Sequence, residues 1–480
     1  MWGENDMIML RAACTIVSAV FLLTVAAETT AQTYSVLHNF TGPPGGSLPN
    51  GSLTLSGSML YGMTSDGGSN NYYGMVFQIN TNGTGYTNLH SFSGGNTDGS
   101  GPNGSLILSG STLYGMTSAG GSSYGKGTLF KISTNGSGYV ILHSFTGVGG
   151  DGSEPYGSLT LSGTNLFGMT YSGGSNAAGT VFKINTDGSG YTNLHVFSGY
   201  PDGAGPYGSL TLSGSTLYGT TYAGGNNYFG GFGTAFKINT DGSGYSILHY
   251  FSAAQDDGEN PRGSLTLSGS TLYGMTYDGG GAHGTVFKIE TNSAGFAVLY
   301  GFGLAAGDGY YPYGSLTLSG STLYGMTSEG GSGGGSGYGT VFQINTDGTG
   351  YQILHNFMGS PSDGIFPYDA VTLSGSTLFG MANQGGNFSS TYGYGIIFSL
   401  DLPVFCITGI ALEGNDILIT WTSGAGTTNA LQAATGPGYA TSNFVDIFAV
   451  TNTVGSVTSY LDAGAVTGFS SRYYRVRLVP

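Results

Sequence analysis

Apolar and small polar residues alternate in short segments that recur along the chain. Residues 157–163 (GSLTLSG) place leucines between serine, threonine and glycine, and this period of two residues is that of a β-strand. Residues 165–170 (NLFGMT), 179–185 (GTVFKIN) and 191–197 (YTNLHVF) follow and are rich in β-branched and aromatic residues. Tight turns, among them Thr-Asp-Gly, separate these segments. The pattern therefore predicts four antiparallel strands joined in chain order.

This group of four segments occurs seven times. No window shows apolar residues at i, i+3, i+4 and i+7, and glycine interrupts each candidate helix. A period of this length is typical of propellers and solenoids. We predict an all-β fold, a seven-bladed β-propeller with four strands per blade, over residues 32–402. The copies start 51 to 55 residues apart, at Gly51, Gly104, Gly157, Gly208, Gly263, Gly314 and, in altered form, Asp369-Ala370.

Loop lengths indicate which strand of each blade lies innermost. Short turns join the first segment to the second and the third to the fourth, whereas a long connection leads to the next copy. GSLTLSG is therefore expected innermost and YTNLHVF outermost. Residues 34–40 (YSVLHNF) then form an outermost strand without a blade of their own, and the last copy stops at its third strand, residues 395–401. We expect the first strand to complete the last blade and close the ring.

The N-terminus differs from the repeats. Residues 12–27 are apolar, follow Arg11 and precede small residues, which predicts a signal peptide over residues 1–31 and a secreted or cell-surface protein. An uncleaved membrane anchor is the alternative, although the apolar run is shorter than the roughly 20 residues that span a bilayer. Two acidic residues are unusual in such a leader, so translation from Met7 or Met9 is a further alternative.

The C-terminal residues 403–480 lose the repeat and its double glycines. Five short segments there have the composition of strands, and turn residues separate them. With a tryptophan strand early and a Tyr-Arg strand last, this region is similar to fibronectin type III modules, which implies a small β-sandwich that acts as a spacer. No apolar tail precedes Pro480, so we expect release from the cell or an attachment that the sequence does not show.

The repeats resemble two families. Leu113-Tyr114-Gly115, Gly120-Gly121 and Leu129-Phe130 resemble the kelch repeat. The pattern LHxFxG, DGxxPxGSL, SGSTLYGMT, GG and GTVFKINTDG resembles more closely the GloVer repeat of choice-of-anchor tandem repeat proteins, over residues 34–401. This resemblance implies a bacterial exported protein without a settled activity. The copies depart from the pattern at Gly45, Tyr300 and Asp369.

Composition and charge narrow the class of protein. The 92 glycines accompany 39% hydrophobic residues, which fits many short strands and excludes general disorder. Without residues 1–31 the chain keeps 9 basic and 22 acidic residues, which argues against nucleic acid and anionic membrane surfaces as partners. Cys14 leaves with the signal peptide, so Cys406 has no intramolecular disulfide partner. We expect a monomer, without an integral membrane segment in the mature chain.

Two repeated features suggest metal sites but have simpler explanations. Histidines occupy one position in six outermost strands, too far apart to converge on one ion, so we expect structural hydrogen bonds. Three Asn-Thr-Asp-Gly hairpins place oxygens at alternate positions but lack the bidentate glutamate of an EF-hand, so plain turns are favoured. We predict no metal and no cofactor. The histidines are His38, His90, His143, His195, His249 and His355.

Aspartates and tyrosines in the long connections are the candidate binding residues. Each aspartate precedes a glycine, where it commonly accepts backbone hydrogen bonds, and a ligand-binding carboxylate ring is the alternative. Tyrosines before the inner strand either wedge between blades or contact a ligand. The candidate ligand-binding residues are Tyr156, Tyr207, Tyr313, Tyr368, Asp151, Asp202 and Asp308. Long loops at the same end carry further aromatics, namely Tyr72, Tyr73, Tyr124, Tyr228, Phe229, Tyr338, Tyr392 and Tyr394.

No catalytic motif stands out. The chain lacks Gly-x-Ser-x-Gly, His-Glu-x-x-His and a phosphate-binding loop with its lysine. We therefore expect an exported, non-enzymatic binding or surface scaffold protein with a glycan or another protein as ligand. The alternative is a secreted polysaccharide-active enzyme, a lyase or hydrolase, on the same scaffold.

Overall fold

The computed structural model describes residues 33–69, 72–226, 231–252, 254, 256–280, 283–333, 337–387, 393–402, 407–413, 416–423, 428–435, 445–451, 456–463 and 472–478. One compact unit, Tyr34–Ser399, contains the repeats, and a second includes Leu400–Pro480. Every regular element in the described residues is a strand, which confirms the all-β prediction. The predicted signal peptide and Cys406 lie outside the described residues.

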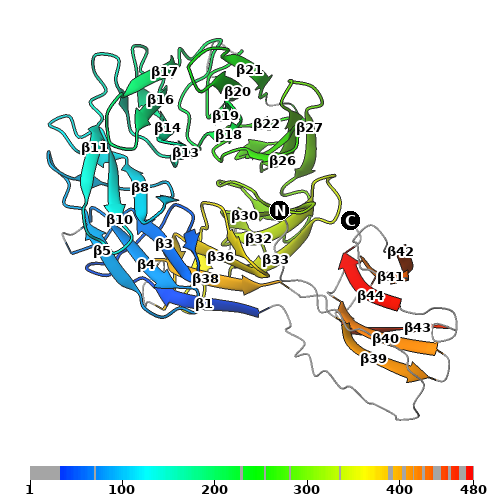
Figure 1. The fold of residues 1–480 in the computed structure, drawn as a ribbon. Coiled ribbons are helices and arrows are strands. Elements are labelled where there is room, and N and C mark those ends of the chain that lie inside the picture. Colours follow the sequence, from blue (N-terminus) through cyan, green and yellow to red (C-terminus); the bar gives the residue numbers. More distant parts are fainter. Residues whose placement is uncertain are drawn as a thin grey trace. The chain divides into compact units, whose positions relative to one another are not determined.

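Seven four-stranded sheets make up the repeat unit, and Figure 1 shows them following one another around a common centre. Across each sheet, the strands are β2 (Thr54–Ser56), β3 (Met59–Thr64), β4 (Met75–Asn80), β5 (Thr87–Ser91); β7 (Ile107–Ser109), β8 (Thr112–Thr117), β10 (Thr128–Ser133), β11 (Val140–Ser144); β13 (Thr160–Ser162), β14 (Asn165–Thr170), β16 (Thr180–Asn185), β17 (Thr192–Val196); β18 (Thr211–Ser213), β19 (Thr216–Thr221), β20 (Thr234–Asn239), β21 (Ser246–Tyr250); β23 (Thr266–Ser268), β24 (Thr271–Thr276), β26 (Thr285–Glu290), β27 (Ala297–Gly301); β29 (Thr317–Ser319), β30 (Thr322–Thr327), β32 (Thr340–Asn345), β33 (Gln352–Asn356); and β35 (Thr372–Ser374), β36 (Thr377–Ala382), β38 (Ile396–Asp401), β1 (Thr33–Asn39).

The strands pair as the hairpin pattern predicts. In the third sheet β13 pairs with β14, β14 with β16 and β16 with β17, all antiparallel. The register between the third and fourth strands shifts at Val181/Phe182, a β-bulge that the sequence pattern did not indicate. In the last sheet the fourth strand comes from the N-terminus, because β1 pairs with β38.

Neighbouring sheets approach closely at their first strands. A Cβ on Gly157 would lie 2.2 Å from the carbonyl oxygen of Gly208, so only glycine fits there. The backbone N–H of Ser158 donates to Oγ of Ser209 at 2.7 Å. The hydroxyl of Thr160 donates to a backbone carbonyl of the next sheet at 2.5 Å. The recurring Gly-Ser-Leu-Thr sequence is therefore explained by contacts between first strands, and these strands surround the centre of the unit.

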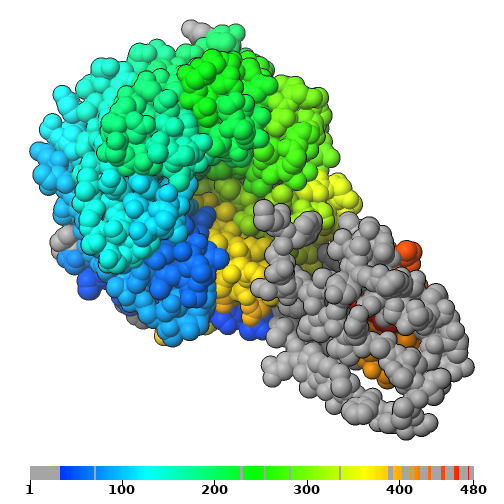
Figure 2. Space-filling model, in the orientation of Figure 1, coloured from blue at the N-terminus to red at the C-terminus, as the bar shows by residue number. Residues whose placement is uncertain are grey.

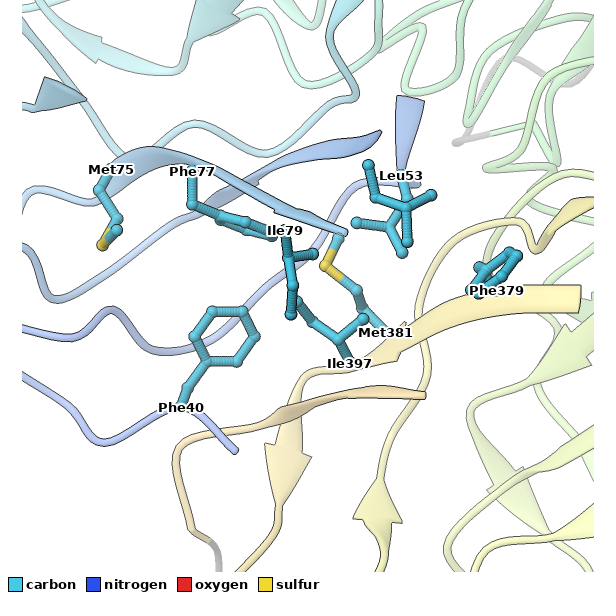
Figure 3. Packing of buried hydrophobic residues seen from close by; sticks show 9 residues of the cluster. Phe40, Leu53, Met75, Phe77, Ile79, Phe379, Met381 and Ile397 are labelled. Carbon is cyan, nitrogen blue, oxygen red and sulfur yellow. The ribbon is translucent and has the colours of Figure 1, made fainter. Parts of the chain in front are cut away.

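Hydrophobic clusters fill the spaces between neighbouring sheets. The cluster in Figure 3 joins the first and last copies, where Phe40 and Phe77 pack with Ile397. The hydroxyl of Thr372 in the last sheet also donates to the carbonyl oxygen of Leu53 in the first, at 2.6 Å. The first and last sheets therefore meet through the same kinds of contact as sheets that are adjacent in sequence. In Figure 2 the colours of the repeat unit run in order around a hollowed centre.

Five additional two-stranded sheets link the connection between copies to the loop after the second strand. The sequence predicted that these two segments lie at the same end of the strands, but not that they pair. The first and fourth copies have isolated bridges instead, Ser47 with Asp66 and Ala204 with Ala223. The pairs are β6 (Gly99–Ser100) with β9 (Ala119–Gly120), β12 (Gly152–Ser153) with β15 (Ser172–Gly173), β22 (Gly258–Glu259) with β25 (Asp278–Gly279), β28 (Gly309–Tyr310) with β31 (Glu329–Gly330), and β34 (Gly364–Ile365) with β37 (Gln384–Gly385).

The C-terminal unit contains two three-stranded sheets in its described residues. One is β39 (Ile407–Glu413), β40 (Asp416–Ser423) and β43 (Ser456–Asp462); the other is β42 (Val445–Thr451), β41 (Thr428–Thr435) and β44 (Arg472–Leu478). Trp421 of the first sheet and Leu431 of the second are fully buried in one core. The sequence pattern had not predicted β39. Within the described part of the whole chain, no helix has the length and apolar character needed to span a membrane.

Candidate functional site

A cavity of about 360 Å³ lies among the first strands of the repeat unit. Each copy contributes the residue that directly precedes the glycine of its inner strand. In the last copy Asp369 takes the place of this glycine. Close packing of the strands behind these residues leaves their side chains facing the common space. All seven residues line the cavity: Asn50, Asn103, Tyr156, Tyr207, Arg262, Tyr313 and Tyr368.

Four tyrosines make one side of this cavity aromatic. The rings of Tyr156 and Tyr207 stack with centroids 4.8 Å apart and planes 12° apart. The hydroxyl of Tyr313 donates to that of Tyr207 at 2.6 Å, and the rings of Tyr313 and Tyr368 lie 4.9 Å apart. All four predicted tyrosines are thus brought together, and they pack against one another as well as lining the cavity. The tyrosines therefore combine the two alternatives, since they pack between neighbouring copies and also face the cavity.

The first and second copies contribute amides instead. Asn50 Nδ2 donates to Asn103 Oδ1 at 2.8 Å, and Asn383 Nδ2 donates to Asn50 Oδ1 at 2.6 Å. Asn103 is held in turn by a bond from its Nδ2 to the hydroxyl oxygen of Ser118 at 3.1 Å. The repeated scaffold therefore carries an asymmetric cavity, with aromatic rings over one arc and amides over another.

Arg262 stands within the aromatic arc. Its guanidinium carbon lies 4.0 Å from the ring centroid of Tyr277 and 4.4 Å from that of Tyr313, with Tyr222 and Tyr207 at 5.0 and 5.7 Å. Such distances place the cation within reach of several ring quadrupoles. Its Nε is buried without a hydrogen-bond partner. Among the described residues, no carboxylate forms an ion pair with Arg262.

Serine hydroxyls and one carboxyl group line the cavity next to the glycines. Each Oγ of Ser158, Ser209, Ser264 and Ser315 accepts the backbone N–H of the preceding copy's serine at 2.7 to 2.8 Å. A hydroxyl that accepts still has its own hydrogen to donate. In the last copy Asp369 replaces the glycine; its Oδ2 accepts from the hydroxyl of Ser105 at 3.3 Å, and burial raises its pKa.

The three predicted aspartates lie elsewhere. Asp151 accepts the backbone N–H groups of Thr146 and Gly152, both at 2.8 Å, and its Oδ1 lies 3.3 Å from Nε2 of His143. The equivalent Asp202 and Asp308 are placed alike, with His195 Nε2 2.9 Å from Asp202 and the Tyr300 hydroxyl 3.0 Å from Asp308. None of the three lines the cavity. Their oxygens hold the connections between copies, so the structure separates them from the four tyrosines.

The histidines stabilise contacts between sheets. His143, for example, stacks on Tyr191 of the next copy with centroids 3.8 Å apart. Five of the six repeated histidines lie within 3.3 Å of the aspartate of their own connection. His38 has Gly45 where the aspartate would be, stacks on Tyr86 at 3.8 Å, and has its pKa lowered to about 4 by burial. Within the described residues, no three histidine, cysteine or acidic side chains gather as a metal site would require.

Among the described residues, the other aromatic candidates do not line the cavity. Tyr72 and Tyr124 are exposed, at 69% and 57%. Tyr228, Phe229 and Tyr392 lie outside the described residues. Sequence reasoning missed Arg262, Tyr277, Glu329 and the two asparagines as lining residues. The signal for three of these was available, because Asn50, Asn103 and Arg262 align with the four tyrosines in the repeat.

Comparison with known proteins identifies the family of the repeat. No curated protein matches this chain. Among solved structures, it is similar to a chain of the nidogen/laminin complex (14% identity, TM-score 0.35, 52% of this chain and 79% of that one). It is also similar to TolB from Acinetobacter baumannii (13% identity, TM-score 0.36, 58% of each chain). These scores are too low to carry a function to this chain. The family model of the Gloeobacter/Verrucomicrobia repeat matches residues 17–232 and 216–398, and the chain therefore belongs to the Gloeobacter/Verrucomicrobia repeat family.

Proposed function

We propose that this protein is a non-enzymatic carbohydrate-binding protein whose ligand occupies the cavity among the first strands. The observation that carries the proposal is the arc of Tyr156, Tyr207, Tyr313 and Tyr368 in a cavity that also presents serine hydroxyls and amides. Tyrosine rings offer rigid apolar faces with a polar tip, which suits the C–H faces and hydroxyls of a sugar. A concave site with few convergent polar groups is the usual form of a small-ligand site.

The proposed architecture is a seven-bladed β-propeller that the N-terminal strand closes. Pairing of β1 with β38 and the packing of Phe40 against Ile397 support closure. The proposed domains are a signal peptide over residues 1–31, the propeller over 32–402 and a fibronectin type III-like spacer over 403–480. The shared core of Trp421 and Leu431 supports a sandwich in the last of these.

We further propose that the protein acts outside the cytoplasm, secreted or at the cell surface, as a monomer. The apolar leader of residues 12–27 supports export. A scaffold of repeated sheets that displays one asymmetric cavity suits capture of an extracellular saccharide. A protein ligand is the alternative, and it predicts that no saccharide in the panel below binds.

The test is a panel of soluble polysaccharides and oligosaccharides, measured for binding to residues 32–480. Replacing Tyr156 with alanine removes an aromatic wall of the cavity, and we expect affinity for any saccharide found to fall by about tenfold or more. Tyr124→Ala is the matched control, because this exposed tyrosine lies outside the cavity. If no saccharide binds, or if both variants bind like the parent protein, the proposed function is wrong.

A polysaccharide-active enzyme is the second candidate, and one observation favours it. Glu329 and Asp369 both line the cavity, so two carboxyl groups face the same space. Glycoside hydrolysis uses such a pair. Release of reducing ends or unsaturated products from the same panel, with loss of turnover in Glu329→Gln, would establish this candidate in place of simple binding.

A further inference from the structure

The charge of Arg262 is the feature of the cavity that binding of a neutral sugar leaves unexplained. Six of the seven equivalent positions carry uncharged side chains, and only this copy presents a cation. Its Nε is buried without a partner. The guanidinium also bonds to the side chains of Tyr222 and Tyr313, which are neutral partners, so its positive charge has no counter-charge among the described residues and is available to a ligand in the cavity.

The surroundings of the guanidinium orient it without neutralising it. Tyr277 and Tyr313 hold it at 4.0 and 4.4 Å from their ring centroids. Tyrosine rings attract a cation but offer no full negative charge at neutral pH. A guanidinium fixed in this way presents a planar set of N–H donors, whose geometry matches the two oxygens of a carboxylate.

The acidic residues of the same cavity do not pair with this cation. Glu329 and Asp369 line the cavity, yet neither forms an ion pair with Arg262 among the described residues. Burial raises the pKa of Asp369, and this carboxyl group bonds instead to Ser105 and the backbone of Ala370. The serine hydroxyls add hydrogen-bond donors, so the cavity around Arg262 offers donors to an acceptor-rich ligand.

We infer that the cavity recognises an acidic sugar, in which a carboxylate pairs with Arg262 while the sugar ring lies against the tyrosines. This inference rests on the proposed carbohydrate-binding function of the same cavity. The formal charge of the chain is −15, so long-range repulsion disfavours a dense polyanion. The favoured ligand is therefore an oligosaccharide with a uronic acid residue and few charges overall.

The test compares one oligosaccharide with and without its negative charge. The probes are an otherwise neutral oligosaccharide that carries one glucuronic acid residue and the methyl ester of the same compound, which share the ring skeleton, and calorimetry measures their binding to residues 32–480. We expect the acid to bind at least about tenfold more tightly than the ester, and this preference to weaken as salt rises. In Arg262→Gln the acid should bind no better than the ester.

Two further variants control for charge and folding. Lys237→Gln removes one positive charge outside the cavity and should keep the preference for the acid. Arg262→Lys keeps the charge but loses the planar donor set, so its preference should be intermediate; it also serves if the glutamine variant fails to fold. Equal binding of acid and ester by the parent protein overturns the acidic-sugar inference alone. Absence of binding by both probes, together with failure of the whole saccharide panel, overturns the proposed function as well.

Discussion

The seam between the first and last copies can be tested by one pair of matched substitutions. Phe40 and Phe145 occupy the same position of the repeat, and they are 2% and 0% exposed. Phe40 meets Phe77 with ring centroids 5.4 Å apart, and Phe145 meets Phe182 at the same distance. Phe145 lies between copies that are adjacent in sequence, whereas Phe40 lies where the first and last copies of the repeat meet.

Truncation of a buried phenylalanine to alanine costs about 3–5 kcal/mol of stability, from lost burial and from the remaining cavity. If the seam packs in solution as tightly as the other interfaces, Phe40→Ala and Phe145→Ala should lower the free energy of unfolding by similar amounts. Urea denaturation followed by circular dichroism reports on the repeat unit. Tryptophan fluorescence follows the C-terminal unit separately, because Trp421 lies there and Trp2 precedes residue 32.

Unequal costs would refute the reasoning. A loss below about 1 kcal/mol for Phe40→Ala, beside about 3 kcal/mol or more for Phe145→Ala, would show that the first and last copies do not pack together in solution. The urea dependence of both variants should keep the slope of the parent protein, since a changed slope would mean that the unfolding unit itself had changed.

Three other outcomes are expected. Burial opposes the ionisation of Asp98, but hydrogen bonds from His90 and Tyr139 outweigh this effect and lower the pKa of Asp98 to about 2. The ionised carboxylate therefore stabilises the fold above about pH 4, and this contribution is lost as the pH falls towards 2. Asp98→Asn should cost about 1–3 kcal/mol at pH 7, and its stability in urea titrations should fall less on acidification than that of the parent protein. Burial lowers the pKa of His38 to about 4, below its usual 6.5, so stability falls as the pH drops through this interval. His38→Phe should keep the stacking on Tyr86, and its melting temperature should depend less on pH between 6.5 and 4.5 than that of the parent protein. An unchanged pH dependence would contradict the lowered pKa of His38. Removal of residues 403–480 should leave the melting temperature of the repeat unit, measured by calorimetry, within a few degrees of its value in residues 32–480, because each unit is compact by itself. Loss of this melting transition would show that the repeat unit needs the C-terminal unit in order to fold.

Strand order was predictable from the sequence because local rules determine it. The alternation in GSLTLSG and the short hairpins depend only on residues that are neighbours in sequence. The observed pairing of β13 with β14, and of β14 with β16, follows this local pattern. The β-bulge at Val181/Phe182 was not predictable, since one extra residue in a ladder has no signature in a short apolar segment. The short pairs such as β12 with β15 were missed because two residues are too few to show a period.

The candidate site was predictable only in part. Tyr156 and Tyr207 were identified from the sequence because tyrosine recurs before the inner strand. The same position in other copies holds Asn103 and Arg262, which a search for aromatic residues does not find. For Asp151 the sequence predicted a turn residue that accepts backbone hydrogen bonds, with a ligand contact as the alternative. The first of these predictions is confirmed, because the carboxylate accepts the backbone N–H groups of Thr146 and Gly152.

The position before the inner-strand glycine differs in its contacts from the positions that follow it. The glycine, serine and threonine that follow it hold neighbouring sheets together, as Gly157, Ser158 and Thr160 do, whereas the preceding side chain faces the cavity. Seven codons can therefore change while the glycine, serine and threonine contacts between neighbouring sheets are kept. A library randomised at these seven positions alone would vary the lining of the cavity on one scaffold, and natural copies can diverge by the same route, one copy at a time.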